Sequence, residues 1–322
     1  MKKFYLGIDG GGTKTEAVLC DEEGNILSHL FESSTNANDV GVDIAIARLT
    51  LLIQKAHDVL AENGCADHSI CVFGGIAGAL NRRDRLLPAL KSTFPEDEIG
   101  IHTDAINLLS SELYRGDGCC MICGTGSVCF VRNGDELKRI AGWGYLLDRS
   151  GSGFSMGREA LEAALRSHDG RGDATLLTGA VMEKLGGAPW DKLSEIYEGG
   201  KPFIASFAPC VISCAEEGDR VAFEILYRQA IYLAECLDAA YNLLDYREEP
   251  LQVVLGGGVF RAKSDLPSLI EQNVTVPINL TIASAPPVFG AVWEAVRNEK
   301  GTVTSDQYMK FKKAFMSDYA MK

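Results

Sequence analysis

The stretch "GIDGGGTKTEAV", residues 7–18, places three consecutive glycines directly after an aspartate. Backbone N–H groups that no Cβ shields can wrap phosphate oxygens, so this stretch predicts a phosphate-binding loop. It does not match the Walker pattern, because Thr13 follows Gly12 where that pattern needs a lysine. A dinucleotide-binding loop would open a helix, whereas "TEAVLCDEEGN" soon reaches a polar turn. The pattern therefore favours a hairpin between two strands.

A second stretch, residues 119–142, repeats this layout. Both read strand, glycine-rich turn, strand, polar turn and strand, with "GGGT" and "GTGS" as the glycine-rich turns and "DEEGN" and "NGDE" as the polar ones. Glycine and asparagine are expected at positive φ in these turns. The repetition predicts an internal duplication with one domain over residues 1–116 and another over 117–322. The crossing between them is expected at "YRGDG", residues 114–118.

The rest of the chain alternates helical and strand patterns, as a mixed sheet flanked by helices requires. Buried strands are predicted in "SICVFGGIAG" and "LQVVLGGGVF", and further strands in "IGIHTDA" and "LTIAS". Helices are predicted at residues 42–60, 82–94, 105–114, 155–167, 173–186, 219–245 and 288–298. The tail "SDQYMKFKKAFMSDY" places Tyr308, Phe311 and Phe315 on one helical face. We expect this helix to dock on the body of the protein, and the tail 304–322 can pack back on the first domain.

Composition narrows the class of protein. The chain has 322 residues, 46% of them hydrophobic and 23% charged, which suits two globular domains. Its net charge of -13 argues against nucleic acid or an anionic membrane surface as a partner. No apolar run reaches the length of a membrane span, and Asp9 interrupts the opening "MKKFYLGID" too early for a signal peptide. We therefore expect a cytoplasmic protein.

Ten cysteines lie mostly inside apolar runs. Cys120 and Cys123 form a C-x-x-C pair, whereas Cys210 and Cys214 are spaced i,i+4 in a helical context. A zinc site would need a second pair at compatible spacing, so buried structural thiols are favoured over metal ligands. Disulfides are not expected in a reducing compartment.

Several residues have the chemistry of a nucleotide site. Asp9 ends a strand and can hold a hydrated Mg²⁺, while "CGTGSV" offers N–H groups and two hydroxyls to phosphate. Gly256–Gly258 follow a buried strand, where a ribose or adenine can approach closely. Asp104 ends another strand and can accept a hydroxyl proton, although an ordinary helix N-cap is the alternative for an aspartate in this place.

These residues resemble the actin/sugar-kinase/Hsp70 superfamily, and more closely the BadF/BadG/BcrA/BcrD-type ATPase family with its N-acetylglucosamine kinase-like branch. The motifs "GIDGGGTKT", "STNAN", "TDA", "GTGS", "GWGYLL", "GSGF", "GREAL", "LGGGVF" and "PPVFGA" occur in the order of that family over nearly the whole chain. The resemblance implies an α/β fold of two duplicated actin-like ATPase (ribonuclease H-like) domains. Each would be a mixed five-stranded sheet flanked by helices, with ATP and sugar in the cleft between them.

The resemblance also implies roles for particular residues. ATP would be bound by Gly11, Gly12, Thr13, Lys14, Thr125, Gly126, Ser127, Gly257 and Gly258. Asp9 would hold Mg²⁺, with water between, and Asp104 would be the catalytic base for a sugar hydroxyl, O6 being the expected one. The sugar would be contacted by Asn36, Asp104, Gly126, Trp143, Asp148 and Arg149. A homodimer is expected.

One segment departs from the family pattern. The kinases follow "GWGYLL" with Gly-Asp-Glu-Gly-Ser, whereas this chain has Asp148-Arg149-Ser150-Gly151-Ser152. Asp148 can restore the acid by a one-residue slip. Arg149 can pair with an anionic substituent, such as the lactyl carboxylate of N-acetylmuramic acid or a phosphate. The alternative, which we slightly prefer, is a sugar pocket that has changed or decayed.

The leading prediction is an ATP-dependent kinase of an amino sugar such as N-acetylglucosamine. The main alternative is an ATPase that activates a 2-hydroxyacyl-CoA dehydratase or benzoyl-CoA reductase. Those activators share the same loops but hold an iron–sulfur cluster across a dimer. Cys123 does precede "GTGS" here, but the cysteine patterns of the activators are absent. A third possibility is a nucleotide or sugar sensor with little turnover.

Overall fold

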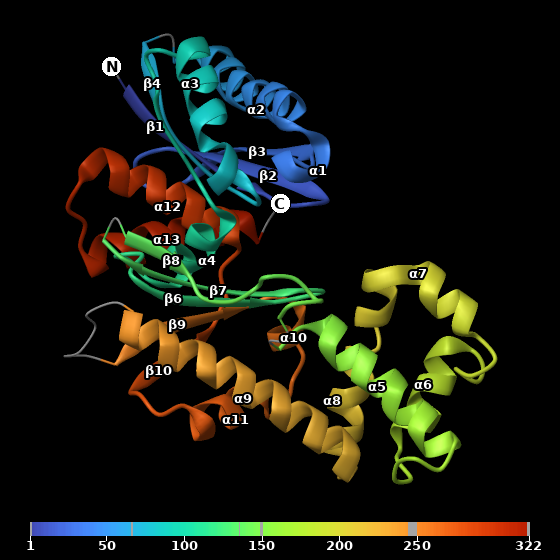
Figure 1. The fold of residues 1–322 in the computed structure, drawn as a ribbon. Coiled ribbons are helices and arrows are strands. Elements are labelled where there is room, and N and C mark those ends of the chain that lie inside the picture. The colour runs from blue at the N-terminus through green and yellow to red at the C-terminus, as the bar shows by residue number, and fades with distance from the viewer. Residues whose placement is uncertain (1, 66, 135, 149–150, 244–249, 321–322) are drawn as a thin grey trace. The chain divides into compact units, whose positions relative to one another are not determined.

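The computed structural model describes residues 2–65, 67–134, 136–148, 151–243 and 250–320. The chain divides into two compact units (Figure 1). Unit 1 contains Met1–Asp117 and Ala283–Lys322, and unit 2 contains Gly118–Ile282. Each unit is built around one five-stranded sheet.

The sheet of unit 1 has the order β3-β2-β1-β4-β5. Its strands are β1 (Lys2–Gly10), β2 (Lys14–Cys20), β3 (Ile26–Ser33), β4 (His68–Ile76) and β5 (Glu98–His102). The first three strands pair antiparallel, and β4 and β5 continue the sheet in parallel with β1. One face of β1, with Phe4, Leu6 and Ile8, packs into the core that includes the helices α2 (Val42–Glu62) and α3 (Arg83–Thr93). The opposite face, with Asp9, lies against α4 (Asp104–Glu112) and α12 (Pro287–Lys300).

The sheet of unit 2 repeats this arrangement, with the order β10-β9-β6-β7-β8. Its strands are β6 (Gly118–Cys123), β7 (Ser127–Asn133), β8 (Glu136–Arg139), β9 (Leu251–Gly256) and β10 (Ile278–Ile282). Again three strands are antiparallel and two are added in parallel. The predicted duplication and the α/β class with two mixed five-stranded sheets are therefore confirmed.

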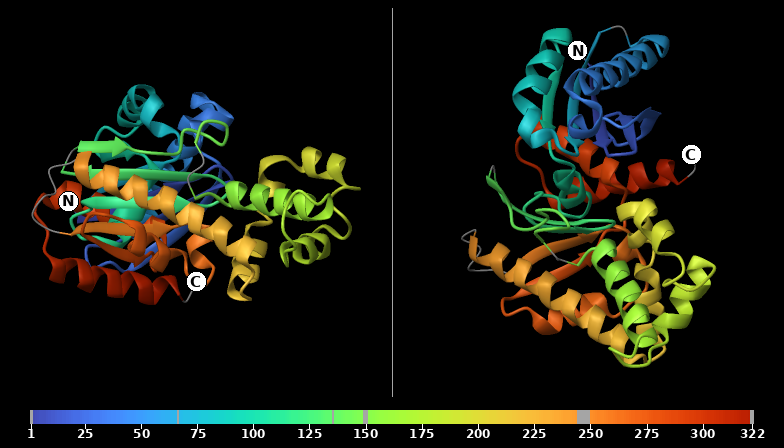
Figure 2. Two further views of the ribbon diagram at one scale, coloured as in Figure 1. Left: turned by 60° about the horizontal axis from the view of Figure 1, so that its bottom comes forward. Right: turned by 45° about the vertical axis from the view of Figure 1, so that its right-hand side comes forward.

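The two units differ in what joins their strands. Between β8 and β9 unit 2 carries α5 (Gly153–His168), α6 (Leu177–Leu185), α7 (Leu193–Ala205), α8 (Ala208–Glu216) and α9 (Arg220–Leu243). Helices α5–α8 stand beyond one end of the sheet, whereas α9 runs along it (Figures 1 and 2). The remaining helices of the described chain are short or terminal: α1 (Ala37–Val40), the 3₁₀ turn at Ala79–Arg82, α10 (Gly258–Arg261), α11 (Leu266–Asn273) and α13 (Ser305–Tyr319). No described helix is long and apolar enough to cross a membrane.

The C-terminal segment differs from the predicted division. A boundary at 116/117 assigned residues 283–322 to the second domain, with the option that the tail 304–322 packs back on the first, whereas the structure places all of 283–322 in unit 1. The reason is close packing that two glycines permit. A Cβ on Gly7 would lie 2.2 Å from the backbone nitrogen of Val292, and one on Gly290 would lie 1.8 Å from the carbonyl oxygen of Asn107. Helix α12 therefore contacts β1 and α4 directly, and α13 follows it with Tyr308, Phe311 and Phe315 buried.

The glycine-rich turns also differ from expectation. In the polar turns Gly24 has φ 93° and Gly134 has φ 58°, as predicted, but none of Gly10, Gly11, Gly12, Gly124 and Gly126 is at positive φ, nor is any described asparagine. Gly10 serves close approach instead, because a Cβ there would lie 2.3 Å from Oγ1 of Thr35. The missing side chain, rather than a left-handed backbone, is what Gly10 contributes.

None of the ten cysteines, all of which lie in the described part of the chain, forms a disulfide. Cys119, Met121 and Cys123 face the core of unit 2, which places Cys120 on the other face of β6. Cys120 and Cys123 therefore cannot bind one ion together. No group of three or more His, Cys, Asp or Glu side chains is arranged for a metal ion in the described part of the chain.

Candidate functional site

The first glycine-rich hairpin joins β1 to β2. Its loop is closed by a hydrogen bond from the Gly11 N–H to the carbonyl of Lys14 at 3.0 Å, and the Ser34 hydroxyl donates to the carbonyl of Gly11 at 3.0 Å. Gly12 and Thr13 are exposed. The loop thus presents exposed backbone beside a strand end, which is what a phosphate-binding turn needs.

Asp9, one residue before this turn, is held by Asn107 of α4. The Asn107 amide Nδ2 donates to Oδ1 of Asp9 at 2.7 Å and to the carbonyl of Gly75 at 3.1 Å. Gly75 must be glycine, because a Cβ there would lie 2.0 Å from Oδ1 of Asn107. The pKa of Asp9 is raised to about 7, chiefly by burial and to a smaller extent by the charges of Asp104 and Glu16, against the lowering effect of the Asn107 hydrogen bond.

Asp104 is the first residue of α4, and Thr103 precedes it as the N-cap. The Thr103 hydroxyl donates to Oδ1 of Asp104 at 2.9 Å. Burial raises the pKa of Asp104, although this hydroxyl and two backbone N–H groups act in the opposite direction. Thr103 rather than Asp104 is thus the N-cap of α4, and Asp104 lies close enough to Asp9 for their charges to interact.

Asn36 caps the short helix α1. Its Oδ1 accepts from the Asn38 N–H at 3.1 Å, and its Nδ2 donates to Oδ2 of Asp39 at 2.6 Å. A Cβ on Gly78 would lie 2.4 Å from Oδ1 of Asn36, and one on Gly12 would lie 3.6 Å from Oδ2 of Asp39. The Asn36–Asp39 pair therefore lies beside both the end of β4 and the first hairpin.

Lys14 is largely exposed, with 70% of its side chain accessible, and its Nζ lies 3.7 Å from Oε2 of Glu16. Glu16 is itself buried and accepts from the Tyr319 hydroxyl at 2.7 Å, while Nε2 of His29 lies 2.8 Å away. In the register of the hairpin Glu16 pairs with Asp9. Acidic side chains thus surround the first hairpin, and Lys14 is free to turn toward an added anion.

The second hairpin joins β6 to β7 and is closed by a hydrogen bond from the Gly124 N–H to the carbonyl of Gly126 at 2.8 Å. Helix α5 begins against it: the N–H of Gly153 donates to the carbonyl of Gly124 at 2.8 Å, and that of Phe154 to the carbonyl of Thr125 at 3.2 Å. This loop is therefore tied to a helix N-terminus rather than to acidic side chains.

A pocket of about 430 Å³ opens beside the second hairpin. It is lined by Gly124, Thr125, Gly153, Pro202, Ala205, Ser206, Ala208, Pro209, Ile212, Gly258, Val259 and Ala262. Gly257 has φ 95°, and a Cβ there would lie 2.3 Å from the carbonyl oxygen of Cys123. The ends of β6 and β9 thus meet at this pocket, whose apolar walls and few polar groups suit a flat heteroaromatic ligand.

The segment that follows β8 folds on itself. Oδ2 of Asp148 accepts from the N–H of Gly142 at 2.6 Å and from that of Trp143 at 3.2 Å. The Asp148 carboxylate thus closes its own loop. The Trp143 side chain is 59% exposed. The guanidinium of Arg139 lies over the Trp143 ring, 4.6 Å from the ring centroid. Arg149 and Ser150 lie outside the described residues.

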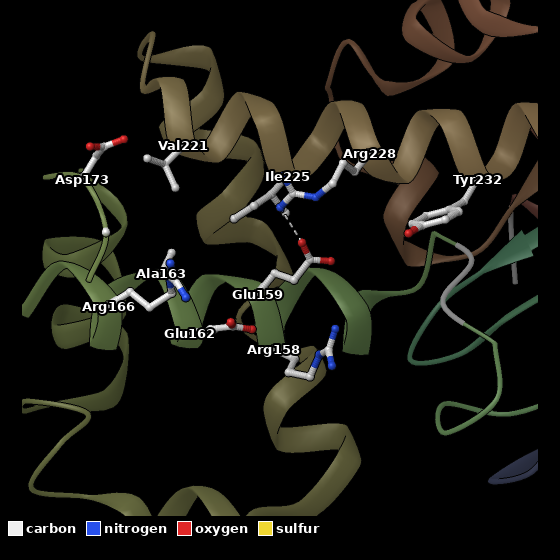
Figure 3. A pocket seen from close by; sticks show the side chains of 11 residues that line it. Arg158, Glu159, Glu162, Ala163, Arg166, Asp173, Val221, Ile225, Arg228 and Tyr232 are labelled. Carbon is white, nitrogen blue, oxygen red and sulfur yellow. Dashed lines mark hydrogen bonds and ion pairs between the residues drawn. The ribbon is translucent and has the colours of Figure 1, made fainter. Parts of the chain in front are cut away.

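Another pocket, of about 290 Å³, lies between α5 and α9 of unit 2 (Figure 3). Two of its carboxylates pair with arginines: Glu159 binds Arg228 at 2.7 Å, and Asp173 binds Arg220. It contains none of the predicted site residues. It therefore has no part in the function proposed below.

The structure groups the predicted residues within each unit. Unit 1 brings together Asp9, Asn36, Asp104 and the loop from Gly11 to Lys14, and unit 2 brings Thr125 and Gly258 together in one pocket. Sequence reasoning missed Asn107 and the pocket wall formed by α7 and α8. An amide three residues after Asp104, in the otherwise apolar "AINLL", was the available signal for Asn107.

Comparison with known proteins identifies the family of the chain. The sequence model of the BadF/BadG/BcrA/BcrD ATPase family matches residues 6–295. The N-acetylmuramic acid/N-acetylglucosamine kinase of Clostridium acetobutylicum is 30% identical over 80% of this chain and 85% of its own length. The N-acetyl-D-glucosamine kinase of Dictyostelium discoideum is 31% identical over 85% of this chain and 90% of its own.

A solved structure of a Chromobacterium violaceum protein shares the fold, with a TM-score of 0.65 and 23% identity over 91% of this chain and 99% of that one. The family match spans both sheets and both glycine-rich hairpins, and it includes Asp9, Asp104 and the pocket of unit 2. The chain belongs to the BadF/BadG/BcrA/BcrD ATPase family.

Proposed function

We propose that this protein is a kinase that transfers the γ-phosphate of ATP to a hydroxyl group of an amino sugar of the N-acetylglucosamine type. The names of the Clostridium and Dictyostelium relatives support the substrate class. The observation that carries the chemistry is the pair of carboxyl groups, Asp9 and Asp104, held beside an exposed glycine-rich turn with their pKa values raised. A raised pKa brings a carboxylate closer to the strength that a general base needs near neutral pH.

In this proposal Asp104 accepts the proton of the sugar hydroxyl, for which we propose O6. The hydroxyl oxygen then forms a bond to the γ-phosphorus while the bond from that phosphorus to the β-phosphate oxygen breaks, which releases ADP. Thr103 keeps the carboxylate of Asp104 oriented by its hydrogen bond to Oδ1. Asn36 donates to and accepts from the sugar in place of one of its present partners.

The residues at the first hairpin suit Mg²⁺. Asp9 is a hard oxygen donor whose charge is disfavoured by burial, and a divalent cation would relieve both that cost and its repulsion from Asp104. When bound, Mg²⁺ neutralises charge on the phosphates of ATP. Asn107 orients the Asp9 carboxylate, and the loop from Gly11 to Lys14 offers N–H groups and one ammonium to phosphate.

For the nucleotide we propose the apolar pocket of unit 2. Gly258, Pro209 and Ile212 would pack against the adenine ring, and Gly257 lets the strand ends approach the ribose. Thr125, Gly126 and Ser127 would donate to the phosphate chain. A homodimer remains a prediction, which size-exclusion chromatography with light scattering would test.

The alternative of an iron–sulfur ATPase activator finds no support in the thiols. Cys120 and Cys123 lie on opposite faces of one strand, as described above. A purified protein without iron, labile sulfide or brown colour would agree with this argument.

The test is ADP release with Mg-ATP across N-acetylglucosamine, glucosamine, N-acetylmannosamine, N-acetylmuramic acid and glucose, followed by NMR of the phosphorylated product. Release that depends on one sugar would support the kinase, and the product would show whether O6 is the acceptor. Release independent of every sugar would favour the ATPase activator. Nucleotide and sugar binding without any product would favour the sensor.

Arg149→Asp in the same panel of sugars tests whether Arg149 recognises an anionic substituent. An unchanged sugar preference would reject that role.

A further inference from the structure

Helix α7 is broken at Gly200, whose φ of 62° and ψ of -159° are not helical. Lys201 and Pro202 follow the break directly, and proline fits the first turn of the new helical segment. Pro202, Ala205 and Ser206 of this segment line the pocket beside the second hairpin. The break thus brings a lysine to the edge of the proposed nucleotide site.

The Lys201 ammonium lies at the hairpin itself. Its Nζ is 3.4 Å from the position that a Cβ on Gly126 would occupy, and 5.4 Å from the centroid of the Tyr145 ring. The side chain is half-buried. Glycine at position 126 leaves the ammonium room to reach the backbone of the turn.

Within the described residues Lys201 makes no ion pair with a carboxylate, unlike Lys3, Lys138, Lys192 and Lys312, each of which lies within 3.1 Å of a glutamate oxygen. A half-buried cation in a chain of net charge -13 usually finds an acidic partner in the protein. Here the nearby groups are an aromatic face and a neutral turn. An ammonium in that position is matched to an anion that the protein does not itself supply.

We propose that Lys201 binds the phosphate chain of ATP beyond the α-phosphate and provides the cation that the second hairpin lacks. The proposal rests on the proposed function, since it takes the pocket of unit 2 to be the nucleotide site. The nucleoside would lie against Pro202 and its neighbours, and the phosphates would extend past Thr125 and Gly126 toward Nζ of Lys201. The lysine would then distinguish ATP and ADP from AMP and adenosine.

The experiment is calorimetric binding of AMP, ADP and the non-hydrolysable analogue AMPPNP to the wild type and to Lys201→Met and Lys201→Arg. We expect Lys201→Met to weaken the binding of AMPPNP and ADP by about 10- to 100-fold and that of AMP by less than about 3-fold. Lys201→Arg should recover part of the loss, because it keeps the charge. Lys184→Met is the matched control: Lys184 also lies over an aromatic ring, Phe207 at 5.9 Å, but a Cβ on Gly126 would have only Lys201 within 4 Å.

Three results would overturn the proposal. Equal loss for AMP and AMPPNP would mean that Lys201 only supports the pocket wall. A lowered melting temperature with unchanged nucleotide affinities would assign it to the contact with Tyr145. A raised KM for the sugar with an unchanged KM for ATP would assign it to the acceptor. If the wild type itself bound no nucleotide, the proposed function would fail first, which separates the two failures.

Discussion

The two glycine-rich hairpins have the same backbone plan and opposite chemical surroundings. We compare the cross-strand pair that lies one position before the pair that closes each loop. In the first hairpin this pair is Asp9 with Glu16, and in the second hairpin it is Ile122 with Val128. The parallel neighbour strengthens the correspondence, because Asp9 pairs with Gly75 of β4 and Ile122 pairs with Gly256 of β9. Two carboxylates at one hairpin are thus replaced by two aliphatic side chains at the other.

The helices around the hairpins continue this difference. At the first hairpin α4 supplies Asp104 and the Asn107 amide that orients Asp9. At the second, α5 is tied to the loop by backbone hydrogen bonds and α7 brings Lys201. The comparison teaches that a duplicated hairpin provides two turns suited to phosphate, whereas the flanking side chains decide what each can do. In the proposed function the first hairpin provides the proton and metal chemistry and contacts phosphate, whereas the second binds the nucleoside and its phosphate chain.

The largest expected effect comes from Asp104→Asn. The amide cannot accept the sugar proton, so sugar-dependent ADP release should fall by about 10²- to 10⁴-fold. Nucleotide affinity, measured by calorimetry, should stay within about 3-fold, because Asp104, at the start of α4, lies beside the first hairpin and does not line the pocket of unit 2. Loss of both properties together would contradict the division of roles between the hairpins.

Gly257→Ala tests the second hairpin. The new Cβ would meet the carbonyl of Cys123 at 2.3 Å on a backbone with φ 95°, so β6 and β9 must separate. We expect a destabilisation of about 1–3 kcal/mol and a several-fold weaker binding of nucleotide. Gly258→Ala is the matched control, because a Cβ there meets nothing within 4 Å and the backbone is unstrained. Equal melting temperatures for the two variants would refute the close approach.

Asn107→Ala tests how the Asp9 carboxylate at the first hairpin is oriented. Asp9 would lose the amide donor that lowers its pKa, so that pKa should rise above about 7. If Asp9 must be ionised, the acidic limb of the kcat/KM profile should move to higher pH, with about 10-fold lower activity near pH 6. Ser111→Ala, which removes only a hydroxyl bonded to the carbonyl of Leu108 in the same helix, is the control. A uniform loss at every pH would indicate a structural role for Asn107 instead.

The smallest expected effect is on stability. Burial raises the pKa of Asp9 to about 7, so below about pH 4 the carboxyl is protonated in both folded and unfolded chains. As the pH rises to 7, the Asp9 carboxyl ionises first in the unfolded chain. Folding must then bury or neutralise this carboxylate, and the resulting loss of folding free energy is constant above pH 7. Asp9→Asn should therefore raise the melting temperature at pH 8 by roughly 2–4 °C and leave it unchanged at pH 4.

Scanning fluorimetry in the absence and presence of Mg²⁺ completes this measurement. Mg²⁺ should stabilise the wild type at pH 8 but not Asp9→Asn, because the carboxylate that would bind it is gone. If Asp9→Asn were less stable than the wild type at pH 8, burial of the ionised Asp9 carboxylate would not destabilise the folded protein as we expect.

Local pattern was enough for much of this protein. Alternating apolar residues around "GGGT" and "GTGS" determined both hairpins, and the helical spacing of Val42 to Leu60 and of Tyr308 to Phe315 determined α2 and α13. Asp9 and Asp104 were identified because a strand end followed by a turn or helix exposes a carboxylate. Such features depend on residues near one another in the chain, so periodicity and turn chemistry suffice.

Tertiary structure alone decided the rest. Nothing near Gly7 or Gly290 in the sequence indicates that α12 packs against β1 and α4, and this packing places residues 283–303 in unit 1 rather than in the predicted second domain. Asn107 gained its role through Gly75, which is 32 residues away, and Lys201 through a break in α7 that brings it to Gly126. Contacts between distant segments depend on how closely backbones can approach and on which polar group lacks a partner after packing. The local spacing of residues in the sequence predicts neither of these.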